Sequence, residues 1–496
     1  MMVTNLHMYV LAAPLLSAFV VNLLGRRFRR GIAPLVIAPL VFSVFGALFV
    51  LARVLRHGTL SYTVGNWRPP FGIELVIDPL SALMLVLIAV VALLASFSAL
   101  LRAEQELPGR EHLFFTLYLI LISGLFGLVL TGDAFNLYVL LEITSITTYG
   151  LIAMGRGRAA LSSFNYIIMG SIGACFYLLG VGYIYILTGT LNMADIARIL
   201  PTINAPVATA TAIAFVLVGL WIKMAFFPLH SWLPNAYSQA PTAAGTLVAP
   251  LMTKVTVYLM VRIILSTFTP ALVFTHAWIT SGVVWAAALA IVCGSALALA
   301  QKDLRRMLTY VIVAEVGYMV GGIFLANTNG LTGALLHIVN DALMTLCLFL
   351  VVAALLYRQG TVSLESLSGA FQRMPVTMAA FTLGAFAMIG VPPTCGFFSK
   401  WYLILGGIDG GHWEFVAALI VSSLINVVLF FRVIELAYFG GIDHTGHGQE
   451  HAAKRHEAPV WMLGPLLITA ALLIVVGLST GLLIDNVIGL MIPAGF

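Results

Sequence analysis

The chain has 496 residues, of which 61% are hydrophobic and 9% charged, and its mean hydropathy is +1.06. No soluble core could absorb so much apolar surface, so the composition excludes an ordinary soluble protein and predicts an integral membrane protein. The polar stretches 58–77 and 443–458 are too short to fold as catalytic domains, which argues against a nucleotide-binding or flavin domain.

Apolar stretches long enough to cross about 30 Å of hydrocarbon as helices recur from end to end. They predict an all-α polytopic membrane protein with about fourteen transmembrane helices. We expect the first stretch to remain in the protein as a helix, because its arginines follow the apolar run rather than precede it. The predicted segments are 8–25, 33–55, 78–101, 112–130, 134–154, 164–189, 209–228, 243–265, 273–300, 305–325, 331–357, 376–407, 413–438 and 460–490.

Alternate loops between these segments differ in positive charge. One set of loops holds fifteen Lys and Arg residues and the other holds four. Because basic loops stay in the cytoplasm, the imbalance predicts a multi-pass protein of the cell inner (cytoplasmic) membrane with both termini outside. The net charge of +5 is dispersed over these loops, so it reports topology and indicates no nucleic-acid partner.

Cysteines and histidines give no sign of a metal site or a cofactor. The four cysteines lie far apart in apolar sequence, which favours core packing. Four histidines in the loop 444–456 lack a metal-ligand spacing, so a solvated loop is the better interpretation. We therefore expect neither a metal ion nor a cofactor.

The remaining charges lie inside apolar segments, where each costs a few kcal/mol or more. A single buried acid could merely join two helices by pairing with a lysine. A set of such groups is instead what a path for protons or cations requires, and that is our interpretation. The six residues are Glu142, Lys223, Lys254, Glu315, Asp341 and Lys400.

Helix breakers accompany two of the three lysines. Pro228 follows Lys223 by five residues, and 392–396 contains two prolines and a glycine just before Lys400. Broken helices in lipid must satisfy their freed backbone groups with protein or water, so we predict hydrated cavities beside both lysines, in broken helices 7 and 12. A packing kink with no transport role is the alternative.

The spacing of charges suggests two inverted five-helix repeats. Glu142 and Lys223 lie 81 residues apart, and Glu315 and Lys400 lie 85 residues apart. Five helices separate the two sets, so the units would enter the membrane from opposite sides, although chance spacing remains an alternative. We hypothesise one Glu–Lys pair in each unit. The predicted divisions are helices 1–3 (1–111), the first repeat with helices 4–8 (112–265), the second with helices 9–13 (266–440), and a His-containing cytoplasmic loop with helix 14 (441–496).

Two histidines are further candidates. His337 and Asp341 are four residues apart on one predicted helix, so both face the same way. The carboxylate could fix the imidazole tautomer and form a relay between Lys254 and Lys400, or the two could be a structural pair. His230 could guard the cytoplasmic mouth beside Lys223, or lie in a wet interfacial loop.

Four sequence stretches carry a resemblance to a known family. TGDAFNLYVLLEI, KMAFFPLHSWLPNAYSQAPTAAGTLVAPLMTKV, QKDLRRMLTY followed by GY, and GVPPTCGFFSKWY resemble the proton-conducting antiporter-like membrane family over about residues 70–440. That family comprises the large Mrp cation/proton antiporter subunits and the antiporter-like subunits of complex I and membrane-bound hydrogenases.

The resemblance implies fourteen helices, inverted repeats and a central row of charged residues. It implies that Glu142 and Lys223 are partners on helices 5 and 7, that Lys254 is the relay lysine and that Lys400 is the terminal lysine. Asp341 departs from the family pattern, which commonly has a second histidine on this helix. Glu315 replaces a residue that is usually small and polar or an amide, so the carriers of the second half are less safely transferred.

Several features bear on the subfamily. The chain has no room for the long lateral helix of the largest complex I member, and both TGTLNMADIA and Lys400 are similar to the Mrp D-type subunit. We therefore expect a subunit of a monovalent cation (Na⁺)/H⁺ antiporter, a secondary transporter rather than an enzyme. The alternative is a proton-pumping subunit of a complex I-type oxidoreductase or hydrogenase, and a third possibility is a subunit that only scaffolds a larger complex.

Overall fold

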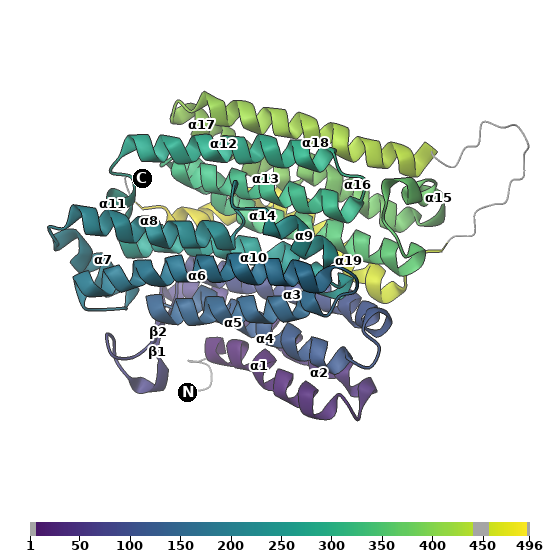
Figure 1. The fold of residues 1–496 in the computed structure, drawn as a ribbon, viewed down its shortest axis with the longest axis horizontal. Helices are drawn as coiled ribbons and strands as arrows, with labels where there is room; N and C mark the ends of the chain where they lie inside the picture. Colours follow the sequence, from purple (N-terminus) through teal and green to yellow (C-terminus); the bar gives the residue numbers. More distant parts are fainter. Residues whose placement is uncertain (1–5, 440–455, 494–496) are drawn as a thin grey trace, which may run out of the picture.

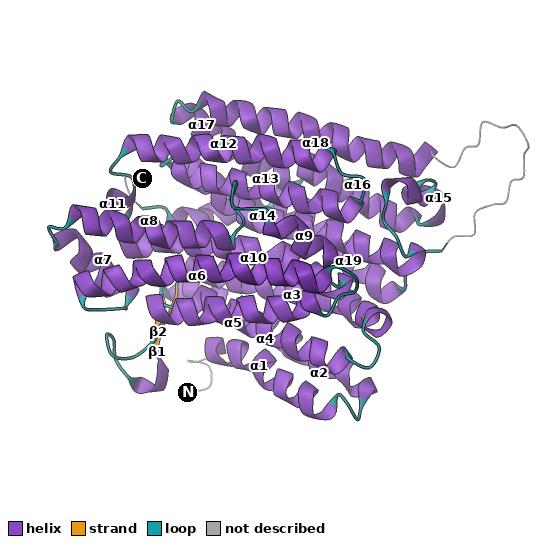
Figure 2. Ribbon diagram, in the orientation of Figure 1, coloured by secondary structure: helices purple, strands orange, loops and turns teal. Residues whose placement is uncertain are grey.

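The computed structural model describes residues 6–439 and 456–493 of the chain. Long helices lie side by side and nearly along one direction, and they make up almost the whole structure (Figures 1 and 2). The helices are α1 (Leu6–Leu24), α2 (Ile32–His57), α3 (Pro79–Glu106), α4 (Glu111–Leu130), α5 (Ala134–Ala153), α6 (Ala159–Thr188), α7 (Met193–Ile199), α8 (Pro206–Lys223), α9 (Trp232–Gln239), α10 (Thr242–Ile263), α11 (Pro270–Val273), α12 (Ala277–Leu299), α13 (Leu304–Phe324), α14 (Thr328–Gln359), α15 (Ala370–Arg373), α16 (Pro375–Ile389), α17 (Cys395–Asp409), α18 (Trp413–Phe439), α19 (Val460–Leu478) and α20 (Thr480–Leu483).

The helix lengths confirm the polytopic fold. Within the described residues, 13 helices are long and apolar enough to cross a membrane. The remaining predicted segment, 376–407, forms the two shorter helices α16 and α17, so the predicted total of about fourteen crossings is retained. Of the predicted cytoplasmic loop, 441–455 lies outside the described residues.

A short hairpin closes one end of the bundle. Strands β1 (Leu60–Thr63) and β2 (Glu74–Ile77) pair antiparallel between α2 and α3. The Asp78 side chain then accepts from the backbone of Ser81 and begins α3.

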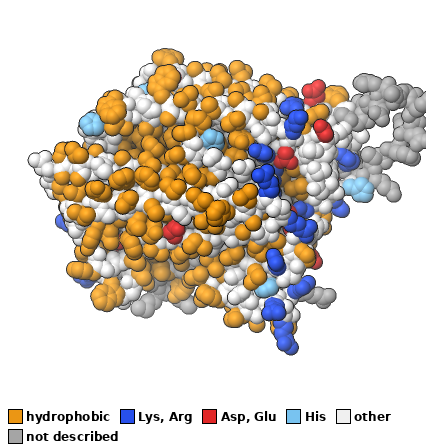
Figure 3. Space-filling model, in the orientation of Figure 1, with side chains coloured by type: hydrophobic (Ala, Val, Ile, Leu, Met, Phe, Trp, Pro, Cys, Tyr) orange, Lys and Arg blue, Asp and Glu red, His pale blue; other side chains and the backbone are white. Residues whose placement is uncertain are grey.

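The centre of the bundle differs from its periphery. Every residue of α10 is buried, and α14 is buried over most of its length. Peripheral helices instead present bulky apolar side chains outward, such as Ile186 on α6 at 82% exposure. Figure 3 shows this apolar covering over most of the visible face, with Lys and Arg gathered toward one end. Such a belt matches a hydrocarbon environment, and α10 and α14 form the protein interior.

Both predicted helix breaks are present. α8 ends at Lys223, and the chain is not α-helical again until α9 begins at Trp232. α16 ends at Ile389, and α17 begins only at Cys395.

Matching backbone landmarks recur in the two halves. Asp133 caps α5 and pairs with Asn192, while Asp303 caps α13 and pairs with Ser363. At the first break the Phe226 amide donates to the Trp221 carbonyl, and at the second the Val391 amide donates to the Phe386 carbonyl. Ala225 and Gly390, each just before these amides, both have positive φ.

These landmarks fit the predicted repeat. α5 is the fifth crossing and α13 the tenth, so the equivalent helices run in opposite directions, as expected for inverted units. The exact division of the chain at residues 112, 266 and 441 stays a prediction.

Close helix crossings depend on small residues. At the crossing of α6 and α8, a Cβ added at Gly219 would lie 2.7 Å from both the Gly173 carbonyl oxygen and the Tyr177 amide nitrogen. Because both neighbours are backbone atoms, they cannot move aside as a side-chain tip could.

We expect Gly219→Ala to push α6 and α8 apart and to destabilise the protein by about 1–3 kcal/mol. Thermal unfolding of the purified protein in detergent would measure the loss. Gly182→Ala on α6 is the matched control, since a Cβ there meets nothing within 4 Å. Equal unfolding temperatures for the two variants would contradict the role of this crossing.

Candidate functional site: a row of buried charges

The first charged pair joins α5 and α8. Lys223 is the last residue of α8, and its Nζ lies 2.8 Å from Glu142 Oε1 and 2.8 Å from Ser145 Oγ. The side chains of Lys223 and Glu142 are 4% and 25% exposed. Because α8 ends at the break, Lys223 stands at the end of its helix. The predicted contact between Glu142 and Lys223 is present.

The second pair lies at the centre of the bundle. Lys254 on α10 places Nζ 2.8 Å from Asp341 Oδ2 on α14, and both side chains are fully buried. The Thr345 hydroxyl donates to Asp341 Oδ1 at 2.8 Å and accepts from Lys254 Nζ at 3.3 Å. Without this pairing either charge would be very costly in so dry a place.

This geometry corrects the predicted pairing of His337 with Asp341. Although the two residues share a helix face, Asp341 contacts the ammonium of Lys254, because an ion pair offsets the desolvation of a buried carboxylate.

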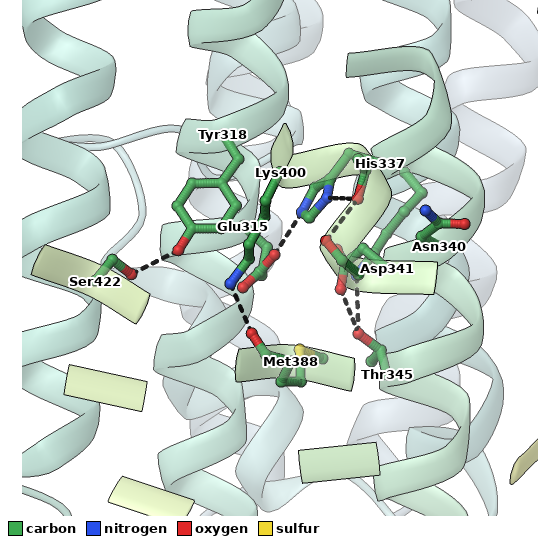
Figure 4. A network of polar contacts seen from close by, with 12 residues as sticks. Glu315, Tyr318, His337, Asn340, Asp341, Thr345, Met388, Lys400 and Ser422 are labelled. Atoms are coloured by element: carbon green, nitrogen blue, oxygen red, sulfur yellow. Dashed lines mark hydrogen bonds and ion pairs between the residues drawn. The ribbon is translucent and has the colours of Figure 1, made fainter. Parts of the chain in front are cut away.

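The imidazole of His337 has other partners. His337 Nε2 lies 2.5 Å from Glu315 Oε2 on α13, and Nδ1 lies 2.9 Å from Ser399 Oγ on α17. Figure 4 shows Glu315 and His337 pointing toward one another from neighbouring helices. With a hydrogen-bond partner on each ring nitrogen, the ring can bind one proton and release another on opposite sides.

Among the described residues Lys400 forms no direct ion pair with a carboxylate, so the predicted Glu315–Lys400 ion pair is wrong, and Glu315 attracts the ammonium only at longer range. Its Nζ donates to the carbonyl oxygen of Met388 at 2.6 Å and lies 5.0 Å from the ring centre of Tyr318 (Figure 4). The Tyr318 hydroxyl donates to Ser422 at 2.7 Å. Backbone carbonyls and an aromatic face thus hold this ammonium.

The charged and imidazole side chains described so far form a row of buried charges: Glu142, Lys223, Lys254, Asp341, His337, Glu315 and Lys400. His230 lies apart from this row, in the break between α8 and α9. Its ring stacks on Phe227 at 5.1 Å between ring centres, and no described residue gives its Nδ1 a hydrogen bond. A gating role for His230 stays a prediction.

The second half of the row holds two groups of contacting side chains. Lys254 contacts Asp341, and His337, one helical turn away on α14, contacts Glu315 and Ser399. In the described part of the chain no hydrogen bond joins the first pair to Lys254. Proton transfer across that step needs a side-chain movement or intervening water, because donor and acceptor must come within hydrogen-bond reach.

Sequence reasoning missed the polar side chains that accompany the charges. Ser145, Tyr318 and Ser399 each contact a charged or imidazole group of the row. Their signal was available, because Ser145 and Tyr318 follow Glu142 and Glu315 by three residues, one helical turn. Within the described residues, no group of three or more His, Cys, Asp or Glu side chains could hold a metal ion.

Comparison with known proteins identifies the family. A family model described as the NADH:quinone oxidoreductase/Mrp antiporter transmembrane family matches residues 131–426, more than half of the chain. The chain belongs to this family. The match spans both charged pairs, His337 and Lys400, so the whole row lies in the part that defines the family.

Relatives of two kinds are similar over nearly the full length. The NADH-quinone oxidoreductase subunit N of Desulforudis audaxviator is 42% identical over 501 residues, covering 99% of both chains. The D-type subunit of the Na⁺/H⁺ antiporter of Alkalihalophilus pseudofirmus is 31% identical over 444 residues, covering 88% of this chain and 87% of the relative.

Solved structures from this family are subunits of multisubunit membrane complexes. A chain of the membrane-bound sulfane sulfur reductase, an archaeal respiratory membrane complex, superposes with a TM-score of 0.88 at 30% identity, covering 98% of this chain and 96% of that one. A chain of the Mrp complex from Dietzia sp. DQ12-45-1b superposes with a TM-score of 0.86 at 26% identity and the same coverage. The protein is therefore an antiporter-like subunit of the Mrp and complex I family.

The central ion pair generates a stability prediction. We expect Asp341→Leu to destabilise the protein by about 3–5 kcal/mol, because it leaves the ammonium of Lys254 buried without its partner. The double variant Lys254→Met with Asp341→Leu should recover most of that loss. Thermal unfolding of the parent, the single variants Asp341→Leu and Lys254→Met and the double variant gives the coupling energy. A double variant no more stable than Asp341→Leu would contradict the pairing.

Proposed function

We propose that the chain translocates protons along this buried row as one subunit of a multisubunit ion-translocating membrane complex. The observation that carries the proposal is the central succession Lys254, Asp341, His337 and Glu315, in which four fully buried ionisable side chains lie within hydrogen-bond reach or one helical turn of one another. Helix packing alone has no need of such costly groups, whereas stepwise proton transfer does.

The first pair acts as the switch. At 2.8 Å, Glu142 and Lys223 attract each other by roughly 6 kcal/mol at an effective dielectric constant of about 20. While they are together the proton is held on the lysine. When the carboxylate moves away this attraction is lost, and the lysine releases its proton toward the centre of the bundle.

The central pair passes the proton on. Lys254 first gives a proton to Asp341, which also accepts from the Thr345 hydroxyl, and then takes a proton from the side of Lys223. Asp341 lies one turn from His337 on α14, so a charge change at the ion pair alters the electrostatic potential at the imidazole.

The last step leads from the imidazole to the terminal lysine. His337 exchanges a proton with Glu315 on one side and with Ser399 on the other. In the part of the chain that the structure describes, no hydrogen bond joins these groups to Lys400, so transfer to Lys400 needs a side-chain movement or intervening water. Lys400 then delivers the proton out of the row.

Exchange against sodium is one candidate for the energy source. The similarity to the D-type subunit of a Na⁺/H⁺ antiporter at 31% identity and to a chain of a Mrp complex supports it. In that assembly a neighbouring subunit's cation movement separates Glu142 from Lys223, the bilayer surrounds the apolar belt and both termini lie outside.

Coupling to quinone reduction is the second candidate. The higher identity of 42%, over 99% of both chains, to an NADH-quinone oxidoreductase subunit N favours it. In that assembly a redox event in partner subunits moves the same pair, and the chain is a translocating subunit of an enzyme.

We expect Glu142→Gln to lower proton transport by the assembled complex roughly a hundredfold, because the amide cannot hold the charge that controls Lys223. Proton uptake by proteoliposomes measures the effect. Glu104→Gln, at an exposed site on α3, is the matched control and should transport like the parent. Loss of assembly together with retained transport in the residual complex would instead support a scaffolding role.

The two energy sources predict different activities of the purified complex. Sodium exchange predicts proton efflux from vesicles on addition of Na⁺ with no electron donor present. Redox coupling predicts proton movement only with an electron donor and quinone, at a rate that follows quinone reduction. Measuring both on one preparation decides between them, and transport that needs neither would contradict both candidates.

A further inference from the structure

An arginine-lined pocket of about 420 Å³ opens at the basic end of the bundle, away from the row of charges. The basic end is defined here as the end where α3 and α14 finish and α10 and α13 begin. The pocket lies among these four helix ends and the two connections α5–α6 and α9–α10. It is the end where Lys and Arg side chains gather in Figure 3.

The deepest cation of this pocket is Arg305, in the first turn of α13. The residue is only 7% exposed, and it lines the pocket. Its one hydrogen bond to a described residue runs from Nη2 to the Pro241 carbonyl oxygen at 3.5 Å, and Nε has none. No described carboxylate forms an ion pair with it, which is unusual for a buried guanidinium.

The neighbouring helix is shaped to admit this guanidinium. A Cβ at Gly245 on α10 would lie 2.9 Å from Arg305 Nη2, so any larger residue would displace the arginine from its place. The lack of a side chain at Gly245 therefore leaves the space that the guanidinium of Arg305 occupies.

The other charged groups leave a positive excess. Arg102 forms an ion pair with Glu106 at 2.5 Å, and Glu106 also accepts from the Ala243 amide at 3.3 Å. Arg156 also lines the pocket. Three arginines thus line the pocket with one carboxylate, Glu106, which is already engaged. Asp303, two residues before Arg305, is a second carboxylate that attracts the guanidinium, and the balance remains positive. The pocket also lies beside the N-terminal end of the 22-residue helix α10, where an anion is favoured.

We propose that this pocket binds a phosphate group, with Arg305 as its principal ligand and Arg102 and Arg156 as supporting cations. A tetrahedral oxyanion has enough oxygens to accept from several guanidinium groups that approach from different helices. The phosphate belongs either to the headgroup of an anionic phospholipid or to a free phosphate or phosphate ester.

Binding there would tie together the ends of α3, α10 and α13. α10 carries Lys254 and α13 carries Glu315, so the ligand fixes the relative position of two helices that supply the row of charges. The inference is independent of proton transport, because it concerns binding alone.

The test uses the whole purified complex, stripped of lipid in phosphate-free detergent buffer. In one arm, inorganic phosphate is titrated and its affinity measured by calorimetry. In the other, the complex is placed in nanodiscs of phosphatidylcholine with or without phosphatidylglycerol, and its unfolding temperature is recorded. The arm in which the parent binds or is stabilised identifies the source of the phosphate.

Arg305→Gln should weaken phosphate binding about tenfold or more, or abolish the stabilisation by phosphatidylglycerol. Arg110→Gln, which removes an exposed charge at the same end, should behave like the parent. A parent that responds in neither arm, or an Arg305→Gln complex that responds like the parent, would overturn the proposal.

If Arg305→Gln fails to fold, a density map of the parent complex still tests whether the pocket binds a phosphate group. Oxyanion density beside the guanidinium of Arg305 is expected. A pocket that holds an acidic side chain of another subunit, or no density, would overturn the assignment.

Discussion

The cost of placing charge in hydrocarbon governs this structure. Each ionised side chain at membrane depth must find a compensating group, and the compensation chosen differs along the row. Glu142 with Lys223 and Asp341 with Lys254 are carboxylate–ammonium pairs, and Glu315 shares a short contact with an imidazole. The buried helix α10 carries Lys254 and the buried helix α14 carries His337 and Asp341, and the outer helices separate these groups from lipid.

The two halves of the bundle use one backbone plan for different chemistry. Counted from the capping aspartates, Glu142 is nine residues beyond Asp133, whereas Glu315 is twelve beyond Asp303. Glu315 therefore stands where Ser145 stands in the first half. Lys223 lies before its helix break and Lys400 lies after the corresponding one. The similar spacings of 81 and 85 residues therefore do not mean equivalent positions. The second glutamate is displaced by one helical turn, and the second lysine lies on the other half of its broken helix.

The sequence predicted the features that follow from local pattern. Hydropathy located the spans and proline located the breaks. The contact between Glu142 on α5 and Lys223 on α8 could be predicted through a family motif. It could not predict contacts that depend on which faces of three helices meet. The i, i+4 spacing of His337 and Asp341 indicated a shared face, but a stronger partner for each came from another helix. The backbone partner of Lys400 carries no side-chain signature at all.

That backbone partner sets how Lys400 can be controlled. The carbonyl oxygens of Met388 and Ile389 are the last of α16 and have no further turn of helix to bond, so they offer the ammonium the negative end of a helix dipole. No change of side chain at 388 or 389 removes those oxygens, and they carry no titratable proton. Glu315 and Asp341 also attract the ammonium at longer range. Its direct contacts, however, depend on geometry, so a small reorientation of the short helix α16 would tighten or release the hold on the final charge.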